Sequence, residues 1–283
     1  MKFKLALLLA VLVAAAGARA QETDAPNIAD FYNATAGNYQ VFAQDSAETA
    51  WEVNQFMNEM LQQYSRYFSN WTPKEGARVI VFSNAEDFRA YAKGPVSFMH
   101  NGLAGYCYLK TDEDGNTFYE LVTYVSDSLW QVLAHEGFHQ FIGYELGRQI
   151  PTWLNEGMAQ FFETSQIEYG RLKTGLIARS KLSAAQYLIR AGRAPSATDL
   201  LQMDRQTFYS GAQVNYPMSW ALVYYLMTRD GPGFSYSRFH QYLQDVKFNY
   251  DSVASFQRRF GRDSYQWESD FQNYILRQRP SLE

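Results

Sequence analysis

Residues 126–146, SDSLWQVLAHEGFHQFIGYEL, constrain the fold of this chain more than any other segment. The segment opens on cap residues and continues as an α-helix that is apolar on almost every side. Its apolar residues are Leu129, Trp130, Val132, Leu133, Phe138, Phe141 and Ile142. A helix of this kind typically runs through the middle of a domain. We therefore expect this central helix to lie at the junction of a sheet-bearing amino-terminal part and a helical carboxy-terminal part.

The pattern of apolar residues changes at the central helix. Before residue 127, short runs rich in Val, Ile and aromatic residues predict strands, and helical spacing predicts one long helix and one short helix. The predicted strands cover 38–44, 77–83, 102–110 and 117–125, and the predicted helices cover 45–68 and 85–93. The turn TDEDGN joins the last two strands as a hairpin. Together these segments predict a sheet of about four strands with the long helix packed on it.

After residue 127, every periodic segment is predicted to be helical. Pro151 opens a second helix, because proline is favoured in a first turn. Further helices are predicted at 180–191, 197–203, 214–229, 234–246 and 263–278. The predicted fold class is therefore α+β, with a small mixed sheet and helices followed by an all-helical carboxy-terminal half.

The first twenty residues have the features of an export signal. Lys2 and Lys4 form a basic start, residues 5–16 are apolar, and Ala18-Arg19-Ala20 fits an A-x-A cleavage site. The apolar run is too short for a comfortable membrane span and is followed at once by polar residues. We therefore expect an exported protein, periplasmic or extracellular, with no membrane anchor after signal cleavage.

Charge and cysteine content exclude several classes of partner and site. The net charge is −4, and cleavage after residue 20 would remove three basic residues and no acid, which gives −7. An acidic chain disfavours nucleic acid and an anionic membrane surface as partners. Cys107 is the only cysteine, so no internal disulfide is possible. It lies in an apolar run, where the favoured interpretation is a buried small hydrophobic residue.

The central helix carries the motif HEGFH at residues 135–139. Residues i and i+4 lie on one face of a helix, so His135 and His139 can direct two imidazoles at one point, as two zinc ligands require. Glu136 lies about 100° further round, where its carboxylate can hydrogen-bond a water beside that point. The alternative is a buried helix with two satisfied histidines, but these polar groups would be costly to bury without a partner.

A catalytic zinc site usually takes three protein ligands, so a third ligand is expected. His100 and His240 are the other histidines, and neither follows the motif at the spacing of a three-histidine site. Glu145 would face away on the same helix. Glu156 lies about one turn into the second helix, and a helix returning across the first would bring it to the histidine face. Glu163, two turns further on, is the alternative ligand or a neighbouring polar group.

The motif HEGFH followed by WLNEGMA (153–159) resembles the gluzincin metallopeptidases, in which HExxH precedes a glutamate ligand on the next helix. TWLNEGMAQFFE in particular looks like the WLNEGFA segment of the zinc aminopeptidases. The chain after the signal looks closer still to exported bacterial proteins described as peptidase MA-like, and YPMSWA (216–221) is part of that similarity. The resemblance implies a thermolysin-like catalytic half. It also implies that His135, His139 and Glu156 hold one Zn²⁺ per chain and that Glu136 is the general base.

The resemblance suggests further roles. A tyrosine hydroxyl is expected to stabilise the oxyanion; Tyr216 fits the family pattern, and Tyr209 is the alternative. Gln160 occupies the position where thermolysin-like enzymes often carry an aspartate that orients a histidine ligand. Strand 102–110 is either an edge strand, in which Ala104, Gly105 and Tyr106 contact an extended substrate, or an interior strand. A G-A-M-E-N segment is absent, so cleavage from the amino end of a substrate is not implied.

We therefore expect a zinc-dependent metallopeptidase that hydrolyses bonds in a peptide or protein substrate. One alternative is a non-catalytic zinc-binding descendant that acts as a binding protein, although an intact Glu136 disfavours it, since a structural site needs no base. Another alternative is a zinc amidase that acts on cell-wall material. The expected organisation is a signal peptide at 1–20, a sheet-bearing subdomain at 21–126 and a helical subdomain at 127–283. The two subdomains are expected to form one catalytic unit.

Overall fold

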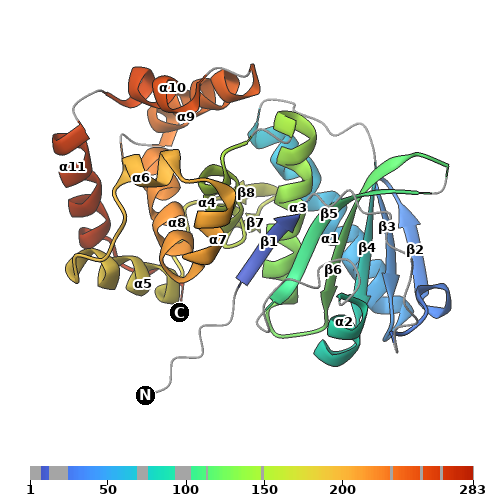
Figure 1. The fold of residues 1–283 in the computed structure, drawn as a ribbon. Coiled ribbons are helices and arrows are strands. Elements are labelled where there is room, and N and C mark those ends of the chain that lie inside the picture. The colour runs from blue at the N-terminus through green and yellow to red at the C-terminus, as the bar shows by residue number, and fades with distance from the viewer. Residues whose placement is uncertain are drawn as a thin grey trace. The chain divides into compact units, whose positions relative to one another are not determined.

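The structure is a computed structural model that describes residues 8–12, 25–68, 76–92, 103–112, 114–147, 150–229, 232–248, 251–261 and 264–282. The described residues form a mixed α+β protein with a small sheet and eleven α-helices, which confirms the predicted α+β class (Figure 1). The chain divides into two compact units, residues 1–141 and 142–283. Each unit is described by itself below.

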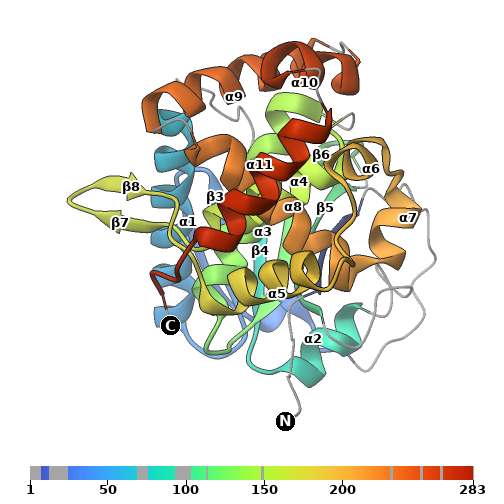
Figure 2. The same cartoon turned by 90° about the vertical axis from the view of Figure 1, so that its left-hand side faces the viewer.

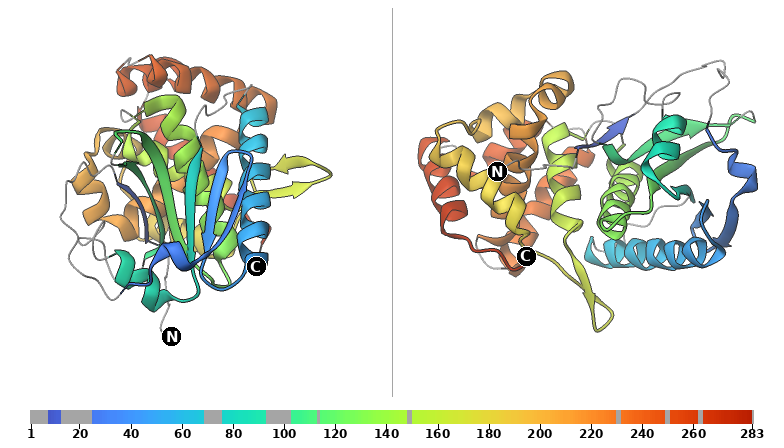
Figure 3. Two further views of the ribbon diagram at one scale, coloured as in Figure 1. Left: turned by 90° about the vertical axis from the view of Figure 1, so that its right-hand side faces the viewer. Right: turned by 90° about the horizontal axis from the view of Figure 1, so that it is seen from below.

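The first unit contains the sheet. Its described elements are β1 (Leu8–Leu12), η1 (Ile28–Asp30), β2 (Tyr32–Ala36), β3 (Tyr39–Ala43), α1 (Ala47–Tyr67), β4 (Ala77–Phe82), α2 (Ala85–Ala92), β5 (Leu103–Thr111), β6 (Thr117–Tyr124) and most of α3 (Leu129–Leu146). The strand order is β1-β5-β6-β4-β3-β2, and the left view of Figure 3 faces this sheet. β3, β4 and β6 run parallel, and the hairpins β2–β3 and β5–β6 are antiparallel. The predicted TDEDGN hairpin is thereby confirmed.

The long helix α1 packs against β2 and β3. It begins where the sequence predicts, because the Ser46 side-chain oxygen accepts a hydrogen bond of 3.0 Å from the Thr49 N–H and caps the first turn. Val53, Met57 and Met60 belong to its buried stripe. Since these residues follow helical spacing, the sequence pattern was sufficient to predict the helix and part of its buried face. Trp51 belongs to the same predicted pattern but is 51% exposed.

The structure corrects the predicted sheet, because the described strands number six rather than about four. β2 lacks the alternating pattern of a half-buried strand, since only Ala34 is buried. Asn54 on α1 holds the β2–β3 hairpin instead: its Nδ2 donates to the Ala36 carbonyl on β2 at 3.2 Å and to the Tyr39 carbonyl on β3 at 2.8 Å. β1 lies within the predicted export signal and pairs parallel with β5. Signal cleavage stays a prediction.

The second unit is helical around α8 (Figure 2). Its described elements are α4 (Thr152–Phe162), β7 (Gln166–Glu168), β8 (Arg171–Lys173), α5 (Arg179–Arg190), α6 (Ala197–Gln202), α7 (Arg205–Ser210), α8 (Ala212–Thr228), α9 (Pro232–Lys247), α10 (Ser252–Phe260) and α11 (Ser264–Arg277). Every residue from Asn215 to Met227 is buried, as expected of a helix that other helices surround. The helices predicted from residue 180 onward are present, with ends shifted by one or two residues.

The expectation that the chain is entirely helical after residue 127 is wrong at one place. Residues 166–173 form the antiparallel hairpin β7–β8. Its turn places Tyr169 at φ 51° and Gly170 at φ 68°, as a tight hairpin turn requires. A tyrosine at positive φ is unusual, so this turn lacks the Asn-Gly signature that would have revealed it. No helix in the described part of the chain is both long and apolar enough to cross a membrane.

Candidate metal centre

The motif helix α3 is buried along its middle. His135, Glu136 and His139 are each at most 1% exposed, and every residue from Val132 to Ile142 is buried. The rings of His135 and His139 lie 4.6 Å apart, centroid to centroid. The helix therefore places the two imidazoles side by side on one face, as the i, i+4 spacing predicts.

Contacts within the first unit hold α3 in register. The Tyr64 hydroxyl on α1 donates to the Ala134 carbonyl at 2.9 Å, and the Tyr39 hydroxyl on β3 donates to Gln140 Oε1 at 2.5 Å. Gly137 allows α1 to approach closely, because a Cβ there would lie 2.9 Å from Met57 Cε. The two histidines are thus carried on a helix anchored immediately before His135 and immediately after His139.

The next helix, α4, carries Glu156. Gly147, at φ 68°, follows the last residue of α3 and permits the turn. Pro151 caps α4, which begins at Thr152, and its carbonyl accepts from the N–H groups of Leu154 and Asn155, both at 3.0 Å. Glu156 therefore lies just over one turn into α4, and it is fully buried.

His135, His139 and Glu156 form a group that could hold a metal ion. Each residue offers one ligand atom, and these atoms all lie within 4.8 Å of one another. The other carboxylates considered from the sequence have different partners. Glu145 pairs with Lys247 Nζ at 2.9 Å, and Glu163 pairs with Lys181 Nζ at 2.8 Å. His100 lies outside the described residues.

A protein-family model matches residues 130–244. Its description is "Protein of unknown function (DUF1570)". The matched segment contains all three residues of the metal-binding group, and it also contains Glu136, Tyr209 and Tyr216. A search of curated proteins found no match. The family model therefore covers the whole candidate site but assigns it no activity.

Two tyrosines lie close to Glu156 or to its helix. The Tyr209 hydroxyl on α7 donates to Glu156 Oε1 at 2.9 Å. Tyr216 on α8 is 6% exposed, and its ring packs 5.4 Å from Phe208 and 6.4 Å from Tyr209, centroid to centroid. The contact between Tyr209 and Glu156 was not predicted, because 53 residues separate the partners and no local pattern links them.

Gln160 joins three helices behind Glu156. Its amide nitrogen donates to the Tyr216 carbonyl on α8 at 3.1 Å, and its amide oxygen accepts from Lys181 Nζ on α5 at 3.1 Å. Lys181 also pairs with Glu163, whose side chain is 4% exposed. The structure therefore places Gln160 in a network that fixes α4 against α5 and α8. Its predicted role beside an imidazole stays a prediction.

The predicted substrate strand is β5. Ala104, Gly105 and Tyr106 are all buried there, and the Ala104 carbonyl accepts from Thr123 Oγ1 at 2.8 Å. Gly105 faces α3, because a Cβ on it would lie 2.6 Å from Val132 Cγ1. Cys107 is also buried, as predicted, and burial raises the pKa of its thiol well above the usual value, with a smaller contribution from the Glu136 carboxylate. A protonated thiol is a poor nucleophile, so the structure supports the packing role of Cys107.

Gly157 controls how closely α4 approaches α8. A Cβ on Gly157 would lie 2.5 Å from the Ser219 carbonyl oxygen, which is backbone and cannot move independently. We expect Gly157→Ala to destabilise the protein by about 1–3 kcal/mol through overpacking, although alanine favours helices. Urea unfolding would measure this loss. Gly137→Ala is the matched control, because its Cβ meets only the flexible end of Met57. Equal stability of the two variants would contradict the expected tight contact between α4 and α8.

Proposed function

We propose that this protein is an exported, zinc-dependent metallopeptidase of the gluzincin type, with a thermolysin-like catalytic half. One observation carries the proposal: His135, His139 and Glu156 are buried with their ligand atoms within 4.8 Å of one another. Glu136 lies between the two histidines on the same helix. A site that only held a structural metal would have no need of this fourth polar residue.

The donor set suits zinc. Two imidazoles and one carboxylate form a set found in catalytic zinc sites, which keep one position open for water. Burial also fits, because a bound cation would offset the cost of burying these polar side chains. When bound, Zn²⁺ supplies a water of lowered pKa and polarises the scissile carbonyl.

The chain's own residues supply the proton transfers. In the proposed reaction, the Glu136 carboxylate accepts a proton from the attacking water and then donates it to the departing amine. The bond between the carbonyl carbon and the water oxygen is kept, and the peptide C–N bond breaks. One water is therefore consumed, and no further reactant is required. The position of Glu136 supports this role, because it lies on the same helix between the two histidines that would hold the metal.

A tyrosine is proposed to donate a hydrogen bond to the oxyanion that forms on the substrate carbon. Tyr216 remains the first candidate, because the Tyr209 hydroxyl is engaged with Glu156. Tyr209 is then proposed to orient the ligand carboxylate.

The two tyrosine roles predict different losses. Tyr216→Phe should lower kcat about 10²–10³-fold with little change in metal affinity, as expected for the loss of one oxyanion donor. Tyr209→Phe should weaken metal binding about 10–100-fold, as expected when a group that orients a ligand is removed. Steady-state kinetics and a competitive zinc titration of both variants would measure the two effects. The reverse pattern would exchange the two roles.

β5 is proposed to bind the substrate backbone. In the described sheet β5 lies between β1 and β6, and β1 lies within residues 1–20. Signal cleavage would therefore leave β5 at the sheet edge, with backbone groups available to an extended peptide. Ala104, Gly105 and Tyr106 would contact the substrate through their backbone, since all three residues are buried.

The proposal as a whole is tested by chelation. The protein without residues 1–20 should hydrolyse a quenched-fluorescence peptide library, lose that activity with 1,10-phenanthroline and recover it with added Zn²⁺. Two alternatives predict other results. A non-catalytic zinc-binding descendant would bind Zn²⁺ but leave the library intact, and a cell-wall amidase would release peptides only from peptidoglycan.

A further inference from the structure

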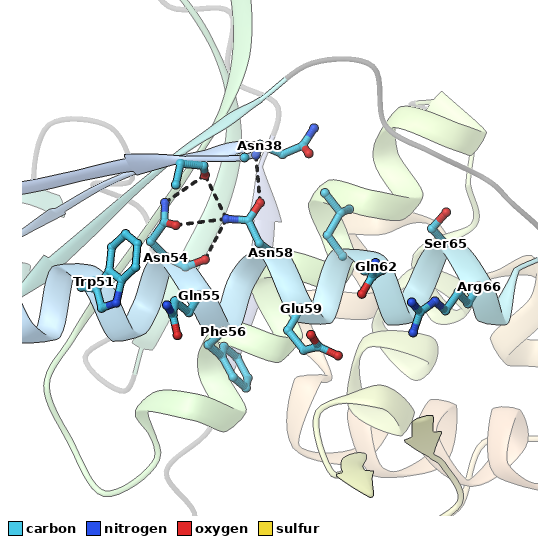
Figure 4. A pocket seen from close by; sticks show the side chains of 13 residues that line it. Asn38, Trp51, Asn54, Gln55, Phe56, Asn58, Glu59, Gln62, Ser65 and Arg66 are labelled. Atoms are coloured by element: carbon cyan, nitrogen blue, oxygen red, sulfur yellow. Dashed lines mark hydrogen bonds between the residues drawn. The ribbon is translucent and has the colours of Figure 1, made fainter. Parts of the chain in front are cut away.

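A groove of about 890 Å³ runs along α1 beside the β2–β3 turn, within the size range of small-molecule binding sites (Figure 4). All of its lining residues belong to the first unit. One wall of the groove is the turn at residues 36–38, and the other is α1 from Trp51 to Arg66. This part of α1 rises about 22 Å, so the groove is long enough for an extended ligand.

One wall of the groove is rigid. Asn58 Oδ1 accepts from the Asn38 N–H at 2.9 Å, and Asn58 Nδ2 donates to the Ala36 carbonyl at 2.9 Å (Figure 4). Gly37 lies between these two contacts at φ 59°, and a Cβ on it would come within 2.1 Å of Asn58 Oδ1. Only glycine fits this turn. Because the wall is already ordered, a ligand would not have to order it on binding.

Three side-chain amides in the groove have hydrogen-bonding groups that could bind a ligand. Among the described residues, the amide groups of Asn38, Gln55 and Gln62 form no hydrogen bond, and each presents two donors and one acceptor. On the same helix, Trp51 leaves 51% of its surface exposed. The groove therefore combines paired donors and acceptors with an exposed aromatic ring.

The charge of the lining limits the ligand. Its ionisable residues are Glu59 and Arg66, which have opposite signs. Glu59 Oε1 also accepts from Gln63 Nε2 at 2.6 Å. A lining without excess charge does not favour an anionic polymer such as nucleic acid. It favours an uncharged ligand that is rich in hydrogen-bonding groups and has an apolar face.

We propose that this groove binds a neutral oligosaccharide. Sugar hydroxyls can donate to the amide oxygens and accept from the amide N–H groups of Asn38, Gln55 and Gln62. The C–H face of a pyranose ring can stack on the Trp51 indole. No residue of the metal-binding group lines the groove. The proposal is therefore independent of the proposed peptidase activity.

Isothermal titration with tetra-N-acetylchitotetraose and with cellotetraose tests the proposal. We expect saturable binding of at least one tetrasaccharide, with the same affinity in EDTA and in Zn²⁺. Trp51→Ala should weaken this binding at least about tenfold, as expected for the loss of an aromatic contact that carries much of the binding energy. Tyr187→Ala is the matched control, because Tyr187 is a 59% exposed aromatic residue on α5 and lies outside the groove. Its affinity should equal that of the unmodified protein.

Thermal unfolding midpoints of the two variants separate loss of binding from loss of folding. Both exposed substitutions should leave the midpoint nearly unchanged. The proposal is overturned if neither tetrasaccharide binds, or if Trp51→Ala folds normally and binds as tightly as the unmodified protein. Trp51-dependent binding of an uncharged peptide such as (Asn-Gly-Ala)₃, without saccharide binding, would also overturn it and would assign the groove to peptides.

Discussion

Replacement of Glu136 by glutamine or alanine should abolish peptide hydrolysis while leaving the metal bound. The expected loss in kcat is about 10²–10⁴-fold, the range supplied by a positioned general base. Glutamine preserves the volume of this 1% exposed side chain but cannot accept the proton from the attacking water. Kinetics on a quenched-fluorescence peptide and zinc content by mass spectrometry, on the same preparation, would measure both parts of the prediction.

Measuring the zinc content of the Glu136 variants separates a loss of proton transfer from a loss of metal. A variant that loses activity together with zinc would show that Glu136 supports the metal rather than the proton transfer. Gln140→Ala is a useful comparison on the same helix, because Gln140 is buried and accepts from the Tyr39 hydroxyl. It should lower stability with little direct effect on chemistry. Unchanged turnover in Glu136→Ala would refute the proposed mechanism.

Replacement of Glu156 by alanine should remove the metal itself. We expect one zinc per chain in the unmodified protein and a loss of affinity greater than about a hundredfold in the variant, which exceeds the usual cost of losing an outer hydrogen-bond partner. The physical reason is that the variant would supply only two of the three protein ligands that a catalytic zinc site usually has. Mass spectrometry after gentle, chelator-free purification would measure the stoichiometry.

Two carboxylates serve as controls for Glu156. Glu145 and Glu163 were the alternative ligands, and each forms an ion pair with a lysine in the structure. Glu145→Ala should retain a full complement of zinc. Glu163→Ala should also retain zinc but lower stability, because it leaves the largely buried Lys181 without its carboxylate partner. Zinc retained in Glu156→Ala and lost in either control would reassign the third ligand.

The sequence was sufficient to predict the elements that carry the site. α3 was predicted because its apolar residues cover nearly the whole helix surface, and the spacing of His135 and His139 placed them on one face. Glu156 was predicted because glycines let the first helix end, Pro151 starts the next, and WLNEG resembles the ligand segment of gluzincins. Periodicity, residue spacing and helix starts are local properties, so each can be recognised in a short stretch of about two helical turns.

The features that the sequence did not predict depend on partners distant in the chain. β2 has no alternating pattern and is held by Asn54, 18 residues beyond Ala36. The contact between Tyr209 and Glu156 and the contact between Gln160 and Lys181 each join separate helices. The β7–β8 turn depends on a tyrosine at positive φ, which composition alone would not place in a tight turn.

The burial of Cys107 has a consequence for how the first unit can be studied. The thiol is fully enclosed at the middle of β5, and its raised pKa keeps it protonated. A thiol reagent can therefore react only after β5 separates transiently from its surroundings. With a single cysteine in the chain, the rate of labelling reports the free energy of that local opening without any added probe. Cys107 therefore reports local opening of β5 two residues beyond Gly105, where β5 contacts α3.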